Sequence, residues 1–225
     1  MKSSTLLRGL LHGGLLLAGG LVFGVGQSVS DRLAADRVTS RSSVEANLEI
    51  GRLTSTIDEL SGRLALFDLK IERMTAVAQY SAAYRIPADL AGLIYDAALA
   101  EGLHPSLGYQ LVKVESGFKS HARSSRGALG LTQVRIATAR EVEPSVTERQ
   151  LLGADMNLRI GFRVLHRLLG QFNHDLELAL RAYNLGPSGA LASLVDTTST
   201  QGADYAGRIL EGVKTKDAKR RTGGI

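Results

Sequence analysis

A heptad pattern of apolar residues in the first third of the chain constrains the fold most strongly. Apolar side chains recur there at alternating steps of four and three residues: Ala46, Ile50, Leu53, Ile57, Leu60, Leu64, Phe67, Ile71, Met74 and Ala78. This spacing is that of positions a and d in a left-handed coiled coil. Because no proline precedes Pro87, the sequence predicts one long helix over residues 28–86.

The charged residues of this segment lie between the apolar positions and predict a solvated outer face. They are Arg52, Asp58, Glu59, Arg63, Asp68, Lys70, Glu72 and Arg73. Two interpretations of the apolar face at 46–78 remain open. The helix self-associates as a coiled coil, or it packs on its own domain or on a partner helix. Gly51 and Gly62 each weaken the helix by about 1 kcal/mol relative to alanine.

Residues 1–27 have the pattern of an export segment. Lys2 and Arg8 precede residues 10–25, which contain no Asp, Glu, Lys or Arg. A basic start followed by an apolar run is typical of a signal peptide or an N-terminal anchor. The alanines expected at a cleavage site are missing, so we favour a retained anchor through residues 10–26. In either case the rest of the chain is expected outside the cytoplasm.

Composition favours an all-α fold, and the net charge limits the kinds of binding partner. The chain has 25 glycines, 4 prolines and few β-branched runs, which favours helices broken by glycine. A formal charge of +5 indicates an anionic neighbour: nucleic acid, a membrane surface or an acidic cell-wall polymer. The absence of cysteine excludes disulfides and thiolate metal ligands.

Pro87 marks the start of a compact helical domain, because the residue before a proline is disfavoured in a helix. Apolar periodicity and end signals predict its helices at 88–101, 105–115, 136–141, 148–153, 155–171, 175–184, 188–195 and 203–213. The expected domains are therefore an anchor or signal at 1–27, a helical spacer at 28–86, a compact helical domain at 87–213 and a basic disordered tail at 214–225. The spacer would hold the domain at 87–213 away from a membrane.

Glu115 is the candidate catalytic residue. It ends an apolar helix, and Ser116 and Gly117 follow it and favour other backbone conformations. Apolar neighbours such as Val114 and Phe118 disfavour the ionised carboxylate, which raises the pKa toward the range of a proton donor at neutral pH. Ser124 and Gln133 in the following polar loop are available as hydrogen-bond partners.

A second catalytic carboxylate is not evident. Glycosidases normally place two carboxylates around the scissile bond. The nearest candidates stand in helix-start or charged contexts that favour capping or surface roles: Glu141, Glu143, Asp155, Asp175 and Glu177. With one carboxylate, the substrate itself must supply the nucleophile.

From about Ala91 to Leu210 the sequence resembles the soluble lytic transglycosylases, whose catalytic domain is similar to goose-type lysozyme. The resemblance rests on ordered motifs: Glu115-Ser116-Gly117-Phe118, Ser124 with Gly127 to Gln133, Ala182-Tyr183-Asn184-Leu185-Gly186-Pro187, and Tyr205-Ala206-Gly207-Arg208-Ile209-Leu210. Asn157 to Gly161 fits the family's Asn-x-x-x-Gly helix. Thr132 stands where many relatives have methionine, from which we expect a more polar groove floor.

The resemblance implies a lysozyme-like helical domain that cleaves the β-1,4 bond between N-acetylmuramic acid and N-acetylglucosamine in peptidoglycan. It implies Glu115 as the single acid and base, with 1,6-anhydro products. The implied substrate-binding residues are Ser124, Gln133, Tyr183, Asn184 and Tyr205. No cofactor, metal or nucleic acid is expected, and the implied location is the periplasm, with an inner-membrane anchor or as a soluble exported protein.

Two alternatives to this function remain. One is a peptidoglycan-binding adaptor or scaffold of an envelope assembly with little turnover, in which the heptad segment recruits partners. The other is a lysozyme-type hydrolase, which is chemically close to a transglycosylase and poorly separated from it by sequence.

Overall fold

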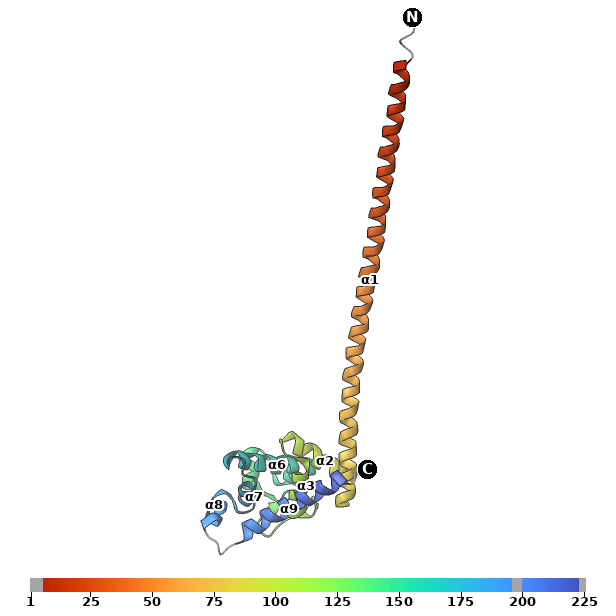
Figure 1. Ribbon diagram of the computed structural model, residues 1–225. Helices are drawn as coiled ribbons and strands as arrows, with labels where there is room; N and C mark the ends of the chain where they lie inside the picture. Colours follow the sequence, from red (N-terminus) through yellow and green to blue (C-terminus); the bar gives the residue numbers. More distant parts are fainter. Residues whose placement is uncertain (1–5, 196–199, 223–225) are drawn as a thin grey trace. The chain divides into compact units, whose positions relative to one another are not determined.

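The residues that the structure describes form helices and one pair of short strands, joined by turns and loops. The computed structural model describes residues 6–195 and 200–222, with side chains for residues 30–195 and 200–216 (Figure 1). The all-α fold with a long N-terminal helix is thereby confirmed. The chain divides into two compact units, Met1–Lys70 and Ile71–Ile225.

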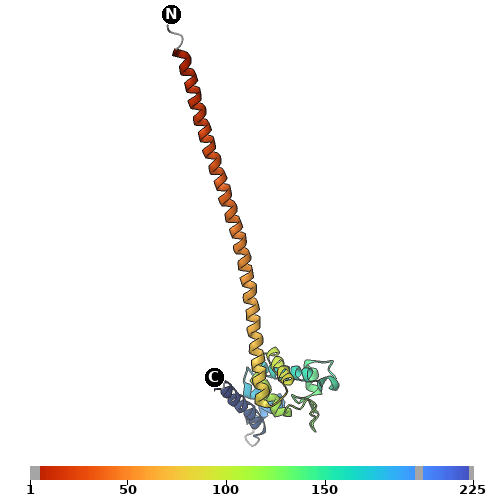
Figure 2. The ribbon, with the colours of Figure 1, turned by 90° about the vertical axis from the view of Figure 1, so that its right-hand side faces the viewer.

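Helix α1, Leu6–Tyr84, is continuous and runs from the first unit into the second (Figure 2). Its large apolar side chains from Leu33 to Met74 are exposed. Within the described residues, no helix has the length and apolar character needed to cross a bilayer. The expected anchor or signal at 1–27 lies outside the residues whose side chains are described.

The last turns of α1 belong to the second unit because they bury side chains in its core. Ala76, Val77 and Tyr80 are buried there. Arg73 donates to both carboxylate oxygens of Asp96, and Nε lies 2.7 Å from Oδ1. The division between the units thus falls before the boundary expected at Pro87, although the helix itself ends at Tyr84, close to that proline.

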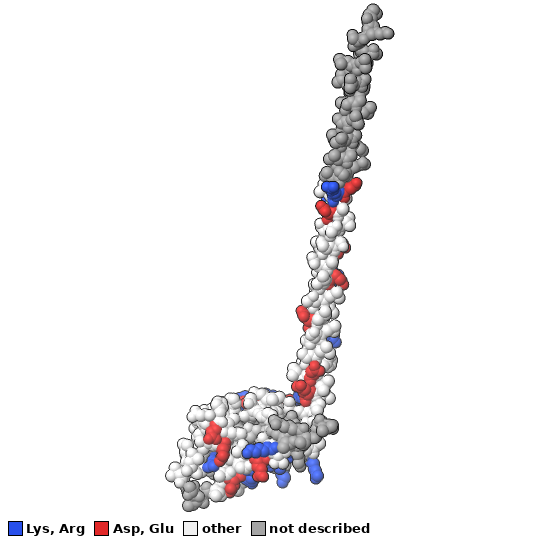
Figure 3. Space-filling view, in the orientation of Figure 1, with Lys and Arg blue, Asp and Glu red and all other residues white. Residues whose placement is uncertain are grey.

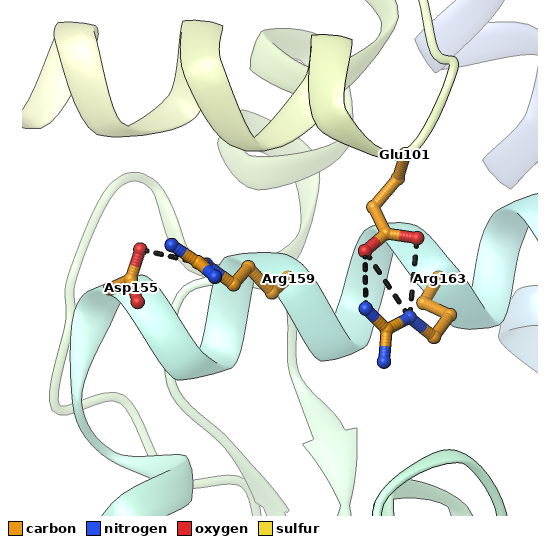
Figure 4. A network of polar contacts seen from close by, with 4 residues as sticks. All are labelled: Glu101, Asp155, Arg159 and Arg163. Carbon is orange, nitrogen blue, oxygen red and sulfur yellow. Dashed lines mark hydrogen bonds and ion pairs between the residues drawn. The ribbon is translucent and has the colours of Figure 1, made fainter.

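Helices α2 (Ala88–Ala100), α3 (Pro105–Ser116) and α6 (Ala154–Gln171) form the centre of the second unit. Pro105 stands in the first turn of α3, where its missing N–H costs nothing, and the His104 side chain accepts from Ser106 N. Arg163 on α6 donates to Glu101 after α2, at 2.8 Å, and Arg159 pairs with Asp155 one turn earlier (Figure 4). The first of these pairs ties α2 to α6.

The loop after α3 folds back through two short antiparallel strands. Strand β1 (Ala128–Leu129) pairs with β2 (Val134–Arg135), with Ala128 opposite Arg135. Helices α4 (Ile136–Val142) and α5 (Glu148–Leu151) follow, and α5 begins with a capping box between Thr147 and Gln150. This strand pair returns the chain from the Glu115 end of α3 to the side of α6.

Asn157 on α6 fixes the turn between the two strands. Its Nδ2 donates to Leu129 O and Leu151 O, each at 2.9 Å, and its Oδ1 accepts from Thr132 N and Oγ1, each at 2.8 Å. Thr132 is fully buried, so the more polar groove floor expected from it is wrong. A Cβ on Gly161 would lie 2.3 Å from Thr132 Oγ1, so α6 approaches the turn as closely as glycine allows.

Helices α7 (Leu176–Leu185), α8 (Pro187–Val195) and α9 (Gln201–Thr222) complete the second unit. The tail expected to be disordered from residue 214 is helical as far as Thr222, and this corrects the sequence prediction. Lys216 gives a physical reason, because its Nζ donates to Ala83 O at 2.9 Å and lies 4.8 Å from the centre of the Tyr84 ring. The end of α9 is therefore held against the end of α1.

Candidate active site

Glu115 lies in the last turn of α3, where the chain turns away sharply. Gly117 and Phe118 have φ angles of 57° and 66°, so two successive residues adopt the left-handed conformation. Glycine tolerates this conformation, whereas phenylalanine needs support from its surroundings. The carboxyl is thereby left at the end of the helix, partly buried beside the polar loop.

The carboxyl of Glu115 accepts a short hydrogen bond from the Tyr205 hydroxyl on α9. Burial raises the pKa of Glu115 from 4.5 to about 7, while the Tyr205 hydrogen bond and the charge of Arg208 oppose the rise. The sequence prediction of a carboxyl with an elevated pKa therefore agrees with the site. Near pH 7 both the protonated and the ionised form are populated, as a group that donates and then accepts a proton requires.

Tyr183 joins α7 to the turn after β1. Its hydroxyl donates to Thr132 O at 2.9 Å. Burial, and then the negative charge of Glu115, raise the pKa of Tyr183 well above 10, and the same two causes act on the pKa of Tyr205. Both phenols are therefore neutral hydrogen-bond donors at neutral pH.

Two of the other three candidate residues make hydrogen bonds within the polar loop, and the third is exposed. Gln133 Nε2 donates to Gly130 O at 2.8 Å and to Ala122 O at 3.3 Å, so its amide nitrogen orders the loop. Ser124 is exposed, and its Oγ accepts from Ala128 N at 2.9 Å. Asn184 is exposed on α7. Of the candidate residues, Tyr205 contacts Glu115 directly, and Tyr183 lies close enough for the charge of Glu115 to raise its pKa.

The remaining acidic candidates have structural roles, as the sequence predicted. Asp175 caps α7 by accepting from Leu178 N at 3.0 Å, and the others pair with neighbouring side chains: Glu141 with Arg167, Glu143 with Ser145, Asp155 with Arg159 and Glu177 with Arg181. Among residues 30–195 and 200–216, no group of three His, Cys, Asp or Glu side chains could hold a metal ion.

Sequence reasoning missed an aromatic cluster beside the Glu115 turn. Tyr84 stacks on Tyr109, with ring centres 5.4 Å apart, and meets Phe118 edge to face at 5.3 Å. Gln110 Nε2 donates to the Tyr84 hydroxyl at 2.8 Å. Phe118 is thus held in its left-handed conformation by the end of α1. The spacing of Tyr80 and Tyr84 by one helical turn was the available signal.

Replacing Tyr84 by alanine is expected to lower the free energy of unfolding by about 2 kcal/mol, because the partly exposed ring loses its contacts with the rings of Tyr80, Tyr109 and Phe118. Tyr84→Phe keeps the ring and loses the hydroxyl that accepts from Gln110, so about 1 kcal/mol is expected. Urea unfolding monitored by circular dichroism measures both changes. Equal losses in the two variants would contradict a role for ring stacking.

Replacing Tyr205 by phenylalanine is expected to raise the pKa of Glu115 above 7, because the hydrogen bond from Tyr205 favours the ionised carboxylate. If protonated Glu115 begins the reaction, the alkaline limb of the pH–rate profile moves upward by about one pH unit. The pH profile of activity between pH 5 and pH 9 measures this shift. An unchanged alkaline limb would show that the Tyr205 hydroxyl does not influence the pKa of Glu115.

The second unit is thus a helical domain with a partly buried carboxyl, that of Glu115, at the end of α3. Residues 92–204, half of the chain, match the transglycosylase SLT domain. The chain belongs to this family.

Known relatives are similar over part of the chain. Peptidoglycan transglycosylase gp16 of Escherichia phage T7 is 33% identical over 104 residues, which are 45% of this chain and 8% of that protein. The lytic transglycosylase Slt of Pseudomonas aeruginosa, solved as an inactive glutamate-to-glutamine mutant, matches with a TM-score of 0.52 and 29% identity over 57% of this chain and 24% of that chain.

The soluble lytic transglycosylase SLT70 of Escherichia coli matches with a TM-score of 0.51 and 19% identity, over 67% of this chain and 30% of that chain. This likeness shows the fold, which confirms the lysozyme-like helical domain expected from the sequence. The present chain spans less than a third of each of these relatives.

Proposed function

We propose that the chain is a peptidoglycan lytic transglycosylase that cleaves the β-1,4 bond between N-acetylmuramic acid and N-acetylglucosamine. The elevated pKa of Glu115, about 7, carries this proposal, because it fits a carboxyl that acts first as an acid and then as a base. Family membership and the peptidoglycan transglycosylase named among the relatives support the substrate class.

The proposed reaction needs one protein carboxyl. Protonated Glu115 gives its proton to the leaving glycosidic oxygen as the bond to the anomeric carbon breaks. The 6-hydroxyl of the same muramic acid then attacks that carbon and gives its proton to the Glu115 carboxylate. A 1,6-anhydro end forms, and the protonated carboxyl is restored without uptake of water. The surface roles of the other candidate acids are consistent with this scheme.

Tyr205 is proposed to position Glu115 and to close the site from α9, because its hydroxyl donates to the reacting carboxyl. Tyr183 is proposed to hold the Thr132 turn and to reach the catalytic region. Gln133 and Ser124 are proposed to order the loop that receives the acetamido groups of the substrate, and Asn184 to shape the turn that follows α7.

The wider organisation is part of the same proposal. Residues 1–27 would anchor the chain in the inner membrane or export it, residues 28–86 would space the catalytic domain from the membrane, and residues 87–213 would act on glycan strands in the periplasm. The apolar face at 46–78 would bind a second copy or a partner helix. Nucleic acid is not among the proposed partners.

Product analysis tests the proposed reaction. Purified protein is incubated with peptidoglycan, and the released fragments are identified by mass. We expect 1,6-anhydromuramic acid ends, which lack one water relative to hydrolysis products. Reducing ends would identify a lysozyme-type hydrolase. Binding to peptidoglycan without release of fragments would identify an adaptor and refute catalysis as the main role.

A further inference from the structure

The a and d positions of α1 form an uncovered apolar seam. Its large side chains from Ile50 to Phe67 are between 49% and 63% exposed: Ile50, Leu53, Ile57, Leu60, Leu64 and Phe67. A helix of this length owes most of its stability to packing of its apolar face rather than to intrinsic propensity. A seam of this regularity, in a helix that also carries charged residues along its length (Figure 3), is typical of a helix with a helical partner.

The residue types at the two seam positions select the number of strands. Position a holds Ile50, Ile57, Leu64 and Ile71, and position d holds Leu53, Leu60, Phe67 and Met74. In parallel coiled coils, β-branched residues at a combined with leucine at d favour two strands. The two heptads from Ile50 to Leu60 follow this rule completely. The seam therefore fits a two-stranded parallel coiled coil.

The flanking charges identify a second copy of the chain as the partner. In a parallel pair, position g of one helix lies beside position e of the next heptad in the other helix. Arg63 at g then lies beside Asp68 at e, and symmetry forms this ion pair twice. Glu49 and Lys70 at g face Thr54 and Thr75, so no like charges meet.

An antiparallel pair over the same residues is less favourable, because it places g beside g. Arg63 then meets Arg63 of the second copy and loses Asp68. Both Gly51 and Gly62 lie off the seam, at positions b and f, and a Cβ at either position would meet nothing within 4 Å. Neither glycine therefore leaves a gap in the proposed interface.

We propose that α1 forms a parallel, in-register coiled-coil dimer through the seam from Ile50 to Met74. This proposal does not depend on the catalytic activity of the second unit. It commits to a second copy of this chain, to one direction and to one register, and each of these three choices can be tested separately.

The absence of cysteine from the chain makes disulfide trapping a clean test of direction and register. Full-length Leu53→Cys and Met74→Cys variants, kept in detergent because of the apolar N-terminal segment, are oxidised mildly and run on a non-reducing gel. Both are expected to form covalent dimers, since identical d positions face each other only in a parallel, in-register pair. Leu48→Cys and Leu66→Cys are matched controls, because these leucines are 63% and 54% exposed but lie off the seam.

The outcomes separate the alternatives. Cross-linking at only one of the two d positions would indicate an antiparallel or shifted pair and overturn the proposal. Equal cross-linking of seam and control variants, or a monomer by sedimentation of the unmodified full chain, would also overturn it.

Charge reversal tests the identity of the partner. Arg63→Glu and Asp68→Arg should each weaken the dimer about threefold to tenfold, because each variant sets like charges side by side twice. The double variant should return to within about twofold of the original Kd, since the pair is re-formed with reversed signs. Additive weakening in the double variant, or no change in any variant, would contradict the proposed pairing.

Discussion

Replacing Glu115 by glutamine is expected to reduce turnover of peptidoglycan on the order of 10³-fold or more, because glutamine has nearly the same shape but cannot donate or accept the proton. The Tyr205 hydroxyl can still donate to the amide oxygen, so the site should keep its geometry. Release of fragments from peptidoglycan, followed by mass, measures the loss. An inactive glutamate-to-glutamine mutant is also the form in which the Pseudomonas aeruginosa relative was solved.

The same variant is expected to be more stable than the natural protein above pH 7. The pKa of Glu115 is about 7 in the folded chain against 4.5 for the ordinary side chain. Between these values the folded state binds more protons than the unfolded state, so stability falls as the pH rises through this window. The penalty at pH 8 is at most about 3 kcal/mol, because the carboxyl is partly exposed. The glutamine variant does not have this penalty, because its side chain does not ionise.

Thermal melting at two pH values separates this effect from a general gain in stability. The Tm of Glu115→Gln should exceed that of the natural protein at pH 8 and approach it at pH 4.5, where the natural carboxyl is already protonated. Full activity of the variant would refute the role of Glu115 in catalysis. An equal difference in Tm at both pH values would refute the elevated pKa.

Replacing Asn157 by alanine is expected to lower the free energy of unfolding of the second unit by about 3–5 kcal/mol. The substitution leaves Leu129 O, Leu151 O and the Thr132 N–H without their partner in a buried place, and each unsatisfied group costs about 1–3 kcal/mol. Activity should fall as well, because the turn that carries Gln133 and receives the Tyr183 hydrogen bond loses its support. Urea unfolding measures the stability.

Asn184→Ala serves as the control for stability in this experiment. It makes the same exchange at an exposed position, where a change within about 0.5 kcal/mol is expected. A similar loss in both variants would show that the buried hydrogen bonds of Asn157 contribute little to the fold.

The helices of the second unit were predictable because their signals are local. Pro105 begins α3, Asp175 caps α7, and Gly117 ends α3 beside Glu115. The residues at each helix end therefore indicate where that helix begins or ends. The elevated pKa of Glu115 was predictable for the same reason, since the sequence places apolar residues such as Val114 and Phe118 close to it. The single-carboxylate interpretation followed from the helix-start and charged contexts of the other acids.

The contacts that were missed join residues far apart in the chain. In the sequence, Thr132 is a polar residue in a polar loop. It is buried because Asn157 and Gly161 on α6 contact it. Lys216 reads as part of a solvated basic tail until Ala83 and Tyr84 lie beside it. Tyr205 was expected to close the groove, whereas its placement on the Glu115 carboxyl depends on the packing of α9 against α3.

The aromatic cluster at the end of α1 determines where a fragment that folds on its own must begin. The segment that matches the family, 92–204, stops one residue before Tyr205 and begins after Tyr80 and Tyr84. A fragment cut at these limits would lose the Tyr205 hydroxyl that donates to Glu115 and the Tyr84 ring that packs on Phe118. The smallest autonomous piece should instead run from about residue 71 to residue 216. The recognisable motif is thus shorter than the unit that must fold together for it to work.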